Sequence, residues 1–334
     1  MDRLALLDLP RPEPRQPDDV LVRIRAAALN RLDLWMTAGL PSVTPSFPFL
    51  VGSDGAGEVE EVGVGVHQVR PGDRVMINPG ISCGRCPACE EGEESVCREF
   101  RLMGEHLPGT AAEYVVVPAG NLGLVPEAMP WPQAAGFSLA TLTAWRMVAG
   151  RARLRAGETA LIWGIGGGVS LAALQIVLLL GGRAIVTSGS DDKLDTARSL
   201  GAAAALHHGR DDVVAEVRRL TGGRGADVVV DSVGERTWPD SLRALRRGGR
   251  VVICGATTGP AAAFDLRRLF WHQWSILGST MGSRREYAEI VRLAHQGRLW
   301  PVVDRVVPLA EGAAAYERMR RGEQTGKLVL EVRP

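Results

Sequence analysis

The sequence lacks the features that mark a membrane protein, a secreted protein or a nucleic-acid-binding protein. Its longest apolar run, Leu171–Leu180, is interrupted by Gln175 and is about half as long as a bilayer span. No cationic segment followed by an apolar stretch begins the chain, so no secretory signal is expected. A net charge of +1 gives no field that would hold nucleic acid or an anionic membrane. We therefore expect a cytoplasmic protein with no nucleic-acid or membrane partner.

Internal repeats and low-complexity linkers are also absent, and the composition is that of a folded globular protein. Hydrophobic residues make up 46% and charged residues 23% of the 334 positions. A chain of this length is long for a single core, so two domains are predicted. Its basic residues are nearly all arginine, which we interpret as coding bias rather than as a recognition surface.

The first part of the chain, to about residue 123, has no helix-length apolar periodicity and is dense in proline and glycine. Short alternating runs predict strands at Val20–Ala28, Gly57–Val62, Asp73–Ile77 and Glu113–Val117. This pattern predicts an all-β region with long connections, folded as a distorted barrel.

From about Trp131 onward, patterns of helix and strand alternate. A helix is expected over Pro132–Val148. Strands are then predicted at Thr159–Trp163, Arg183–Ser188, Asp227–Asp231, Arg250–Cys254 and Ser275–Leu277, and helices at Val169–Leu180, Asp191–Leu200, Asp211–Leu220 and Pro239–Arg247. Such alternation predicts an α/β fold with a doubly wound parallel sheet.

The last part of the chain returns to short strands after a helix that a capping box opens at Ser283-Arg-Arg-Glu286. Strand patterns at Val302–Pro308 and Leu328–Val332 are expected to rejoin the first domain. The predicted β-rich domain therefore comprises residues 1–123 and 280–334, and the predicted dinucleotide-binding domain comprises residues 124–279.

A glycine-dense turn, Gly164–Ser170, follows the first strand of the parallel sheet. Glycines that open a helix after a strand let the backbone and the helix N-terminus approach a pyrophosphate. The strict Gly-x-Gly-x-x-Gly spacing fails here, because Val169 stands where the third glycine belongs. Taken alone, the turn is equally a tight connection between core elements.

Four cysteines, Cys83, Cys86, Cys89 and Cys97, lie within fifteen residues of a turn-rich segment. This clustering predicts a tetrahedral zinc site whose four ligands leave no position open, so the zinc would be structural. An iron–sulfur cluster is the rival interpretation. The fifth cysteine, Cys254, stands alone on a predicted strand and is interpreted as a buried apolar residue.

The chain resembles the medium-chain dehydrogenase/reductase superfamily, which includes zinc alcohol dehydrogenases and quinone oxidoreductases. The resemblance extends along essentially the whole chain. It is carried by the cysteine lobe and by the segments Ala28–Asp33, Gly52–Val59, Val69–Val75, Ala112–Pro118, Ala140–Trp145, Gly225–Gly234 and Gly326–Leu330. It implies a GroES-like β-barrel catalytic domain and a Rossmann cofactor domain.

The departures from the zinc alcohol dehydrogenases concern the catalytic metal. The resemblance places metal ligands where this chain has Asn30, Ser53 and Leu139, and only Asp54 beside them could help. A catalytic zinc needs three protein ligands, so none is expected. His67 and His106 are weighed as substitute ligands and set aside as isolated histidines.

Without a metal, the resemblance favours hydride addition to a quinone, an enone or a related activated carbonyl compound, because hydrogen bonds can hold the resulting enolate. Asn30, Asp33 and Asp54 are the expected catalytic residues, with the Asn30 amide donating to a substrate carbonyl. The alternative for Asn30-x-x-Asp33 is a turn held by local side-chain bonds. Many relatives have a tyrosine near position 35, where this chain has Trp35, so water is the expected proton source.

The resemblance also implies a nicotinamide cofactor. The acid that binds the NAD ribose is replaced by Ser188, and Lys193 follows, which favours NADP(H) over NAD(H). Relatives that bind NADPH place a tyrosine near His208, and Arg210 lies close in sequence. Asp191 and Asp192 weaken the positive field. The expected cofactor-binding residues are Thr143, Gly164, Gly166, Gly167, Gly168, Val169, Ser188, Lys193, His208, Gly255 and Lys327.

Two further interpretations remain open. One is an alcohol dehydrogenase or aldehyde reductase of the same fold, acting on small alcohols or aldehydes. The other is a non-catalytic protein, as some lens crystallins of this superfamily are. A homodimer or homotetramer is expected, because relatives pair through the edge strand near Ser275–Ser279.

Overall fold

The computed structural model describes residues 4–40, 43 and 46–332, and the chain divides into two compact units. The first unit contains the chain before Thr143 and from Gly282 onward, and the second unit is Thr143–Met281. The second unit begins later than the predicted residue 124, because α3 (Trp131–Ala135) packs against strands of the first unit.

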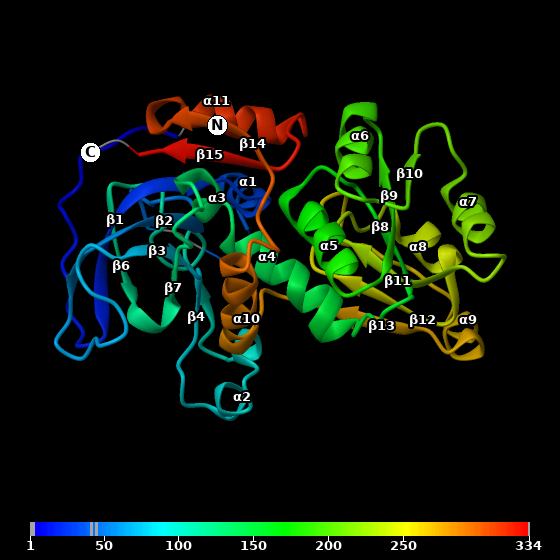
Figure 1. The fold of residues 1–334 in the computed structure, drawn as a ribbon, viewed down its shortest axis with the longest axis horizontal. Coiled ribbons are helices and arrows are strands. Elements are labelled where there is room, and N and C mark those ends of the chain that lie inside the picture. Colours follow the sequence, from blue (N-terminus) through cyan, green and yellow to red (C-terminus); the bar gives the residue numbers. More distant parts are fainter. Residues whose placement is uncertain (1–3, 41–42, 44–45, 333–334) are drawn as a thin grey trace. The chain divides into compact units, whose positions relative to one another are not determined.

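The first unit is built on a seven-stranded sheet with the order β14-β15-β1-β2-β3-β7, in which β6 also pairs with β1 (Figure 1). Its strands are β1 (Asp19–Ala28), β2 (Asp54–Val62), β3 (Arg74–Ile77), β6 (Tyr114–Pro118), β7 (Leu122–Leu124), β14 (Val303–Pro308) and β15 (Lys327–Glu331). All pairs are antiparallel except β14 with β15. The two C-terminal strands thus join a sheet that the N-terminal strands begin.

The core of this unit follows from the alternation in β1, where Val20, Val22 and Ile24 point into one buried cluster. Strands β1 and β2 approach so closely at Gly57 that a Cβ there would collide with the Arg23 carbonyl oxygen. Only glycine fits at this crossing, which fixes the position of β2 and therefore of Asp54 at its start.

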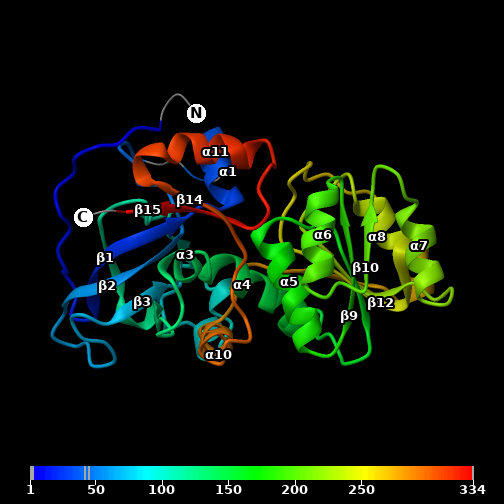
Figure 2. The same ribbon diagram turned by 45° about the horizontal axis from the view of Figure 1, so that its top comes forward.

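Two helices, α1 (Arg31–Ala38) and α2 (Pro87–Glu90), correct the expectation that the chain to about residue 123 is all β. The first unit also contains α3, the helix α10 (Arg284–His295) that the capping box predicts, and α11 (Gly312–Arg320). Helix α10 starts with the predicted capping box, since Ser283 Oγ accepts from Glu286 N and Glu286 Oε2 accepts from Ser283 N. Helices α1 and α11 lie side by side in Figure 2 and contact each other. Short segments complete the unit: β4 (Gly80–Ile81), η1 (Glu94–Val96), β5 (Arg101–Leu102), η2 (Ala119–Asn121) and η4 (Leu309–Glu311).

The second unit is the predicted doubly wound fold. Its six strands are parallel, in the order β10-β9-β8-β11-β12-β13. Their bounds are β8 (Thr159–Ile162), β9 (Arg183–Ser188), β10 (Ala204–His207), β11 (Ala226–Asp231), β12 (Leu245–Ile253) and β13 (Ser275–Gly278). Figures 1 and 2 show α5 (Gly168–Leu179) and α6 (Asp191–Ser199) on one face, and α7 (Val213–Leu220) and α8 (Trp238–Ala244) on the other. Helix α9 (Leu266–His272) precedes the edge strand β13.

Two predicted helices have different bounds in the structure. The helix expected over Pro132–Val148 is divided into α3 and α4 (Ser138–Trp145), followed by the π-helical turn η3 (Arg146–Arg151). The helix expected to reach Arg247 ends at Ala244, where β12 begins. In β12, Arg246 forms an ion pair with Asp227 of the neighbouring strand β11. The sequence around Arg246 does not predict this pair. Within the described ranges, no helix is both long enough and apolar enough to cross a bilayer.

Candidate functional site

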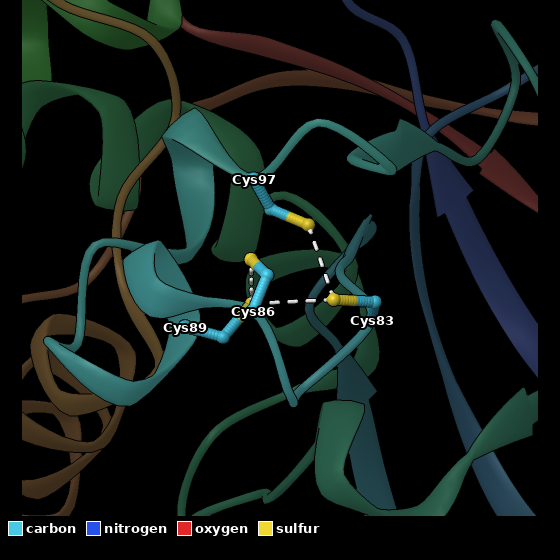
Figure 3. A group of neighbouring side chains, drawn as sticks. All are labelled: Cys83, Cys86, Cys89 and Cys97. Carbon is cyan, nitrogen blue, oxygen red and sulfur yellow. Dashed lines mark hydrogen bonds between the residues drawn. The ribbon is translucent and has the colours of Figure 1, made fainter.

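The four lobe cysteines come together as predicted. Figure 3 shows their side chains converging from the loop around α2, with Cys86 at the helix N-cap and Cys97 just after η1. The Sγ atoms of Cys83 and Cys89 are 3.9 Å apart, those of Cys86 and Cys89 3.5 Å, and those of Cys97 and Cys83 3.6 Å. A hydrogen bond from the Arg85 backbone lowers the pKa of Cys83 to about 7, toward the thiolate that a metal binds.

These distances fit a single tetrahedral ion. With zinc–sulfur bonds of about 2.3 Å, tetrahedral geometry puts the sulfur atoms about 3.8 Å apart. All four Sγ atoms lie within 4.8 Å of one another, whereas a multi-iron cluster needs room between its thiolates for several metal and sulfide atoms. The residues therefore fit a structural zinc. Across the described residues this is also the only grouping of three or more His, Cys, Asp or Glu that could hold a metal.

A second polar cluster surrounds Asp54, which is fully buried at the start of β2. Its Oδ1 accepts a hydrogen bond of 2.7 Å from the Leu139 backbone N–H. Its Oδ2 accepts from Lys327 Nζ at 2.8 Å and from Asn30 Nδ2 at 3.0 Å. The carboxylate is therefore held by three donors, which come from α4, from β15 and from the residue before α1.

The structure places the ammonium of Lys327 in this cluster, and its predicted role in cofactor binding stays a prediction. The residue is the first of β15, and its side chain is 3% exposed. Its Nζ donates to Asn30 Oδ1 at 2.6 Å as well as to Asp54 Oδ2. Of all the described residues, only these two lie within hydrogen-bond distance of Nζ. Both of these hydrogen bonds of the Lys327 ammonium therefore go to predicted catalytic residues.

Asn30 is held by both ends of its amide. Its Oδ1 accepts from Lys327, and its Nδ2 lies 3.0 Å from Asp54 Oδ2 and 3.4 Å from the Ala28 carbonyl oxygen. The expected donation from this amide to a substrate carbonyl therefore competes with protein acceptors. Asn30 also precedes α1, and its backbone N–H donates to Asp33 Oδ2 at 2.7 Å. The Asn30-x-x-Asp33 pattern thus forms a local side-chain bond, as the alternative interpretation of this pattern predicts.

Asp33 is fully buried, and its second oxygen, Oδ1, has no hydrogen-bond partner among the described residues. Burial raises the pKa of Asp33 to about 7, although the Asn30 backbone N–H and the positive charge of Lys327 oppose the shift. The same carboxylate contributes to raising the pKa of the buried Tyr316 hydroxyl, for which desolvation is the main cause. Asp33 therefore closes the start of α1, and burial keeps the pKa of its carboxyl well above the usual range.

The cluster does not fit the catalytic zinc that zinc-dependent relatives hold. Asn30 Oδ1 and Asp54 Oδ2 already bind an ammonium, which excludes a metal ion from the same oxygens by charge and by contact. Leu139 has no ligand atom, and the buried hydroxyl of Ser53 has no partner among the described residues. The substitute histidines are also elsewhere: His67 is exposed, and His106 Nδ1 accepts from the Leu102 N–H.

The glycine turn of the second unit has the backbone conformation that a pyrophosphate site needs. Gly164 and Gly166 have φ values of 66° and 125°, which favour glycine. Gly167 caps α5, and Ser170 Oγ lies 3.1 Å from the Gly164 carbonyl and 3.0 Å from the Gly167 carbonyl. Ser170, the residue after Val169, therefore links the start of the helix to the turn through these two carbonyls. The first-turn N–H groups, which include those of Gly168 and Val169, have no carbonyl within the helix to bind.

The residues predicted to select the cofactor gather at the carboxyl end of β9. A Cβ on Gly166 would lie 2.6 Å from Lys193 Cδ, so the Lys193 stem covers the glycine turn. The His208 ring packs on Gly189, next to the buried Ser188. Arg210 pairs with Asp191 through two hydrogen bonds of 2.5 and 3.1 Å, which lower the pKa of Asp191.

Two predicted cofactor residues have no contact that assigns them a role. Thr143 is nearly buried, and its hydroxyl lies 3.7 Å from Met281 Sδ. Gly255 follows β12 and is partly exposed. Both stay predictions.

Comparisons with known proteins agree with this architecture. Residues 16–127 match the alcohol dehydrogenase GroES-like domain, and residues 168–296 match the zinc-binding dehydrogenase domain. An alcohol dehydrogenase of Geobacillus stearothermophilus is 31% identical over 94% of this chain and 92% of its own. A crotonyl-CoA carboxylase/reductase of Cereibacter sphaeroides is 31% identical over 91% of this chain and 78% of its own.

A solved structure of an NAD-dependent alcohol dehydrogenase is 44% identical, with a TM-score of 0.93 over 98% of this chain and 95% of that one. Two domain matches, relatives that span nearly the whole chain and a cysteine cluster that fits zinc lead to one assignment. The chain belongs to the zinc-binding medium-chain dehydrogenase/reductase superfamily and is an oxidoreductase of that family.

Proposed function

We propose that this protein is an NADP(H)-preferring reductase of quinones, enones or related activated carbonyl compounds that works without a catalytic metal. The observation that carries the proposal is the Asn30–Asp54–Lys327 cluster, in which an ammonium occupies the oxygens that a metal would need. The lobe cysteines would hold one structural zinc, which keeps the lobe folded and takes no part in the reaction.

The chemistry of the cluster favours this substrate class. A bound nicotinamide supplies the hydride. Addition of hydride to an activated C=C or quinone leaves negative charge on an oxygen, and fixed donors and positive charge stabilise that oxygen. Oxidation of an alcohol instead requires a lowered hydroxyl pKa, which zinc provides in the metal-dependent relatives. Water remains the proposed source of the proton.

A second candidate is an alcohol dehydrogenase or aldehyde reductase acting on small alcohols or aldehydes. The similarity to the Geobacillus alcohol dehydrogenase and to the 44% identical NAD-dependent alcohol dehydrogenase favours it. Metal content separates the two candidates, because metal-assisted alcohol oxidation requires a second zinc in each chain.

A screen on protein of measured zinc content tests the proposal. We expect one zinc per chain, and turnover of quinones or enones at a higher kcat/KM than that of any alcohol or aldehyde. Two zinc ions per chain together with faster alcohol oxidation would establish the second candidate. No hydride transfer to any member of the panel would favour a non-catalytic protein.

NADP(H) preference is proposed from the end of β9. Ser188 presents no negative charge to a 2′-phosphate, the Lys193 stem lies over the glycine turn, and Arg210 neutralises Asp191.

We expect Lys193→Met to raise KM for NADPH roughly tenfold or more while KM for NADH changes little, since a charge-assisted hydrogen bond contributes about 1.5–3 kcal/mol. Lys193→Arg is the matched control that keeps the charge. Equal kcat/KM for the two cofactors in the unaltered protein would disprove the preference.

A homodimer or homotetramer is proposed from the edge of the second unit's sheet. Strand β13 pairs only with β12 among the described strands, and the preceding α9 exposes Leu266, Phe270 and Trp271 by 66%, 68% and 66%. Open strand edges and grouped apolar side chains are features of interfaces.

Light scattering should give at least twice the chain mass, and Phe270→Asp/Trp271→Asp should give a monomer. Val64→Asp, at a residue 92% exposed in the other unit, should change nothing. A monomeric unaltered protein would refute the proposal.

A further inference from the structure

Lys327 is one of only two lysines in the chain, beside 37 arginines, the other being Lys193. Its partner Asp54 is fully buried, and the two residues are 273 positions apart in sequence. Removing an ammonium from water costs several kcal/mol, so a buried lysine is retained only where its charge is paired and hydrogen-bonded. Lys327 meets that condition through Asp54 and Asn30.

The cluster leaves one donor of the ammonium unassigned. An ammonium has three N–H groups, and two of them are used by Asn30 Oδ1 at 2.6 Å and Asp54 Oδ2 at 2.8 Å. Both oxygens belong to residues whose other contacts are fixed: Asp54 Oδ1 by the Leu139 N–H, and Asn30 Nδ2 by Asp54. The stem of Lys327 passes close to Gly136, because its Cβ and Cγ lie 3.2 and 3.1 Å from the position that a Cβ on Gly136 would take. The positive charge is therefore held in one place before any substrate arrives.

We propose that Lys327 is the fixed cation of the catalytic site and takes the electrostatic part that a metal has in zinc-dependent relatives. Its ammonium orients the Asn30 amide and stabilises the negative oxygen that hydride addition creates on the substrate. The step assigned to it is electrostatic: a hydride supplied by a bound nicotinamide would form the new C–H bond, the C=C pair would shift toward the carbonyl carbon and the C=O pair to the oxygen, and water would protonate the product while Lys327 keeps its protons. This inference rests on the proposed reductase function.

Neutralising the ion pair as a unit separates catalysis from folding. In Lys327→Met/Asp54→Asn, the amide introduced at position 54 can still accept from the Leu139 N–H and, once the Asn30 amide turns over, donate to Asn30 Oδ1, so no unpaired charge is left at positions 54 and 327. With the best quinone or enone from the screen, we expect kcat to fall about 10²–10³-fold, the loss typical of removing one electrostatic donor. KM for NADPH and the single zinc per chain should stay the same.

Two comparison variants show whether loss of the ammonium causes the fall in kcat. Asp54→Asn alone keeps the ammonium, and its kcat should exceed that of the double variant at least tenfold. Asp304→Asn/Arg318→Met neutralises a partly exposed ion pair of the same unit and should keep full activity. A folded double variant with kcat within a factor of about three of the unaltered protein, or one no slower than Asp54→Asn, would overturn the proposal. Failure of the proposed function is a different result, in which the unaltered protein itself reduces no quinone or enone.

A measurement on the unaltered protein applies even if the double variant does not fold. Labelling with ¹⁵N-lysine gives two side-chain nitrogen signals, and Lys193→Arg assigns them. We expect the Lys327 nitrogen to be a charged ammonium that exchanges its protons slowly at neutral pH. The signal of a neutral amine would overturn the proposal, because an uncharged lysine cannot stabilise an oxyanion in this way.

Discussion

Lys327→Met should lower the free energy of unfolding by about 3–5 kcal/mol, because it leaves the buried carboxylate of Asp54 without its counter-charge. The methionine keeps most of the stem that packs near Gly136, so lost packing explains little of the change. Two neutral donors, the Leu139 N–H and Asn30 Nδ2, still reach the carboxylate. Urea unfolding followed by tryptophan fluorescence measures the difference.

The double variant is the control for this prediction. Lys327→Met/Asp54→Asn should recover most of the lost stability, since replacing a whole buried pair is often nearly neutral. The Asp304→Asn/Arg318→Met pair should cost no more than about 1 kcal/mol, as its side chains are 14% and 27% exposed and its charges are partly screened. If the single and the double variant lose the same free energy of unfolding, the unpaired charge of Asp54 does not explain the loss in Lys327→Met.

Zinc removal should have the second large effect, and it should be local. Cys97→Ser should reduce the metal content from one zinc per chain toward none. We expect tryptic cleavage at Arg85, inside the cysteine lobe of residues 83–97, and at Arg98 and Arg101, just after it, to accelerate about 10²-fold or more, because structural zinc supplies several kcal/mol of folding free energy. Timed digestion followed by mass spectrometry locates the cuts.

Cys254→Ser is the matched control for the zinc prediction, because that cysteine lies in the other unit and outside the cluster. It should keep one zinc per chain and the cleavage rate of the unaltered protein. An unchanged zinc content in Cys97→Ser would contradict the four-cysteine site. A visible absorption band in the unaltered protein would instead indicate iron.

The cysteine site could be predicted in full from the sequence because all its ligands lie within one short loop. The parallel sheet could be predicted for a similar reason, since each β–α repeat carries its own apolar pattern. Helix α1 was missed although a signal was present: Asn30 and Asp33 form the bond that closes its first turn. The pattern predicts only a turn, because a helix of eight residues shows little apolar periodicity.

The Asp54–Lys327 pair could not be predicted from local pattern. No spacing rule connects residues 273 positions apart, and a lysine that opens a short strand looks like any exposed lysine. The family resemblance drew attention to Lys327 but assigned it to the cofactor. The contacts of the Asn30 side chain could not be predicted either, because its Oδ1 accepts from Lys327 of β15 and its Nδ2 donates to Asp54 of β2, and both depend on how these strands lie beside β1.

The late position of Lys327 has a consequence for biosynthesis. Every strand of the second unit's sheet lies between Thr143 and Met281, so that sheet can be completed while the chain is still being made. The first unit begins earlier but must wait for β14 and β15, and until then Asp54 has no counter-charge and β1 lacks a neighbour. We therefore expect the sheet of the second unit to form first, and the sheet of the first unit to be completed only when its two C-terminal strands have been made.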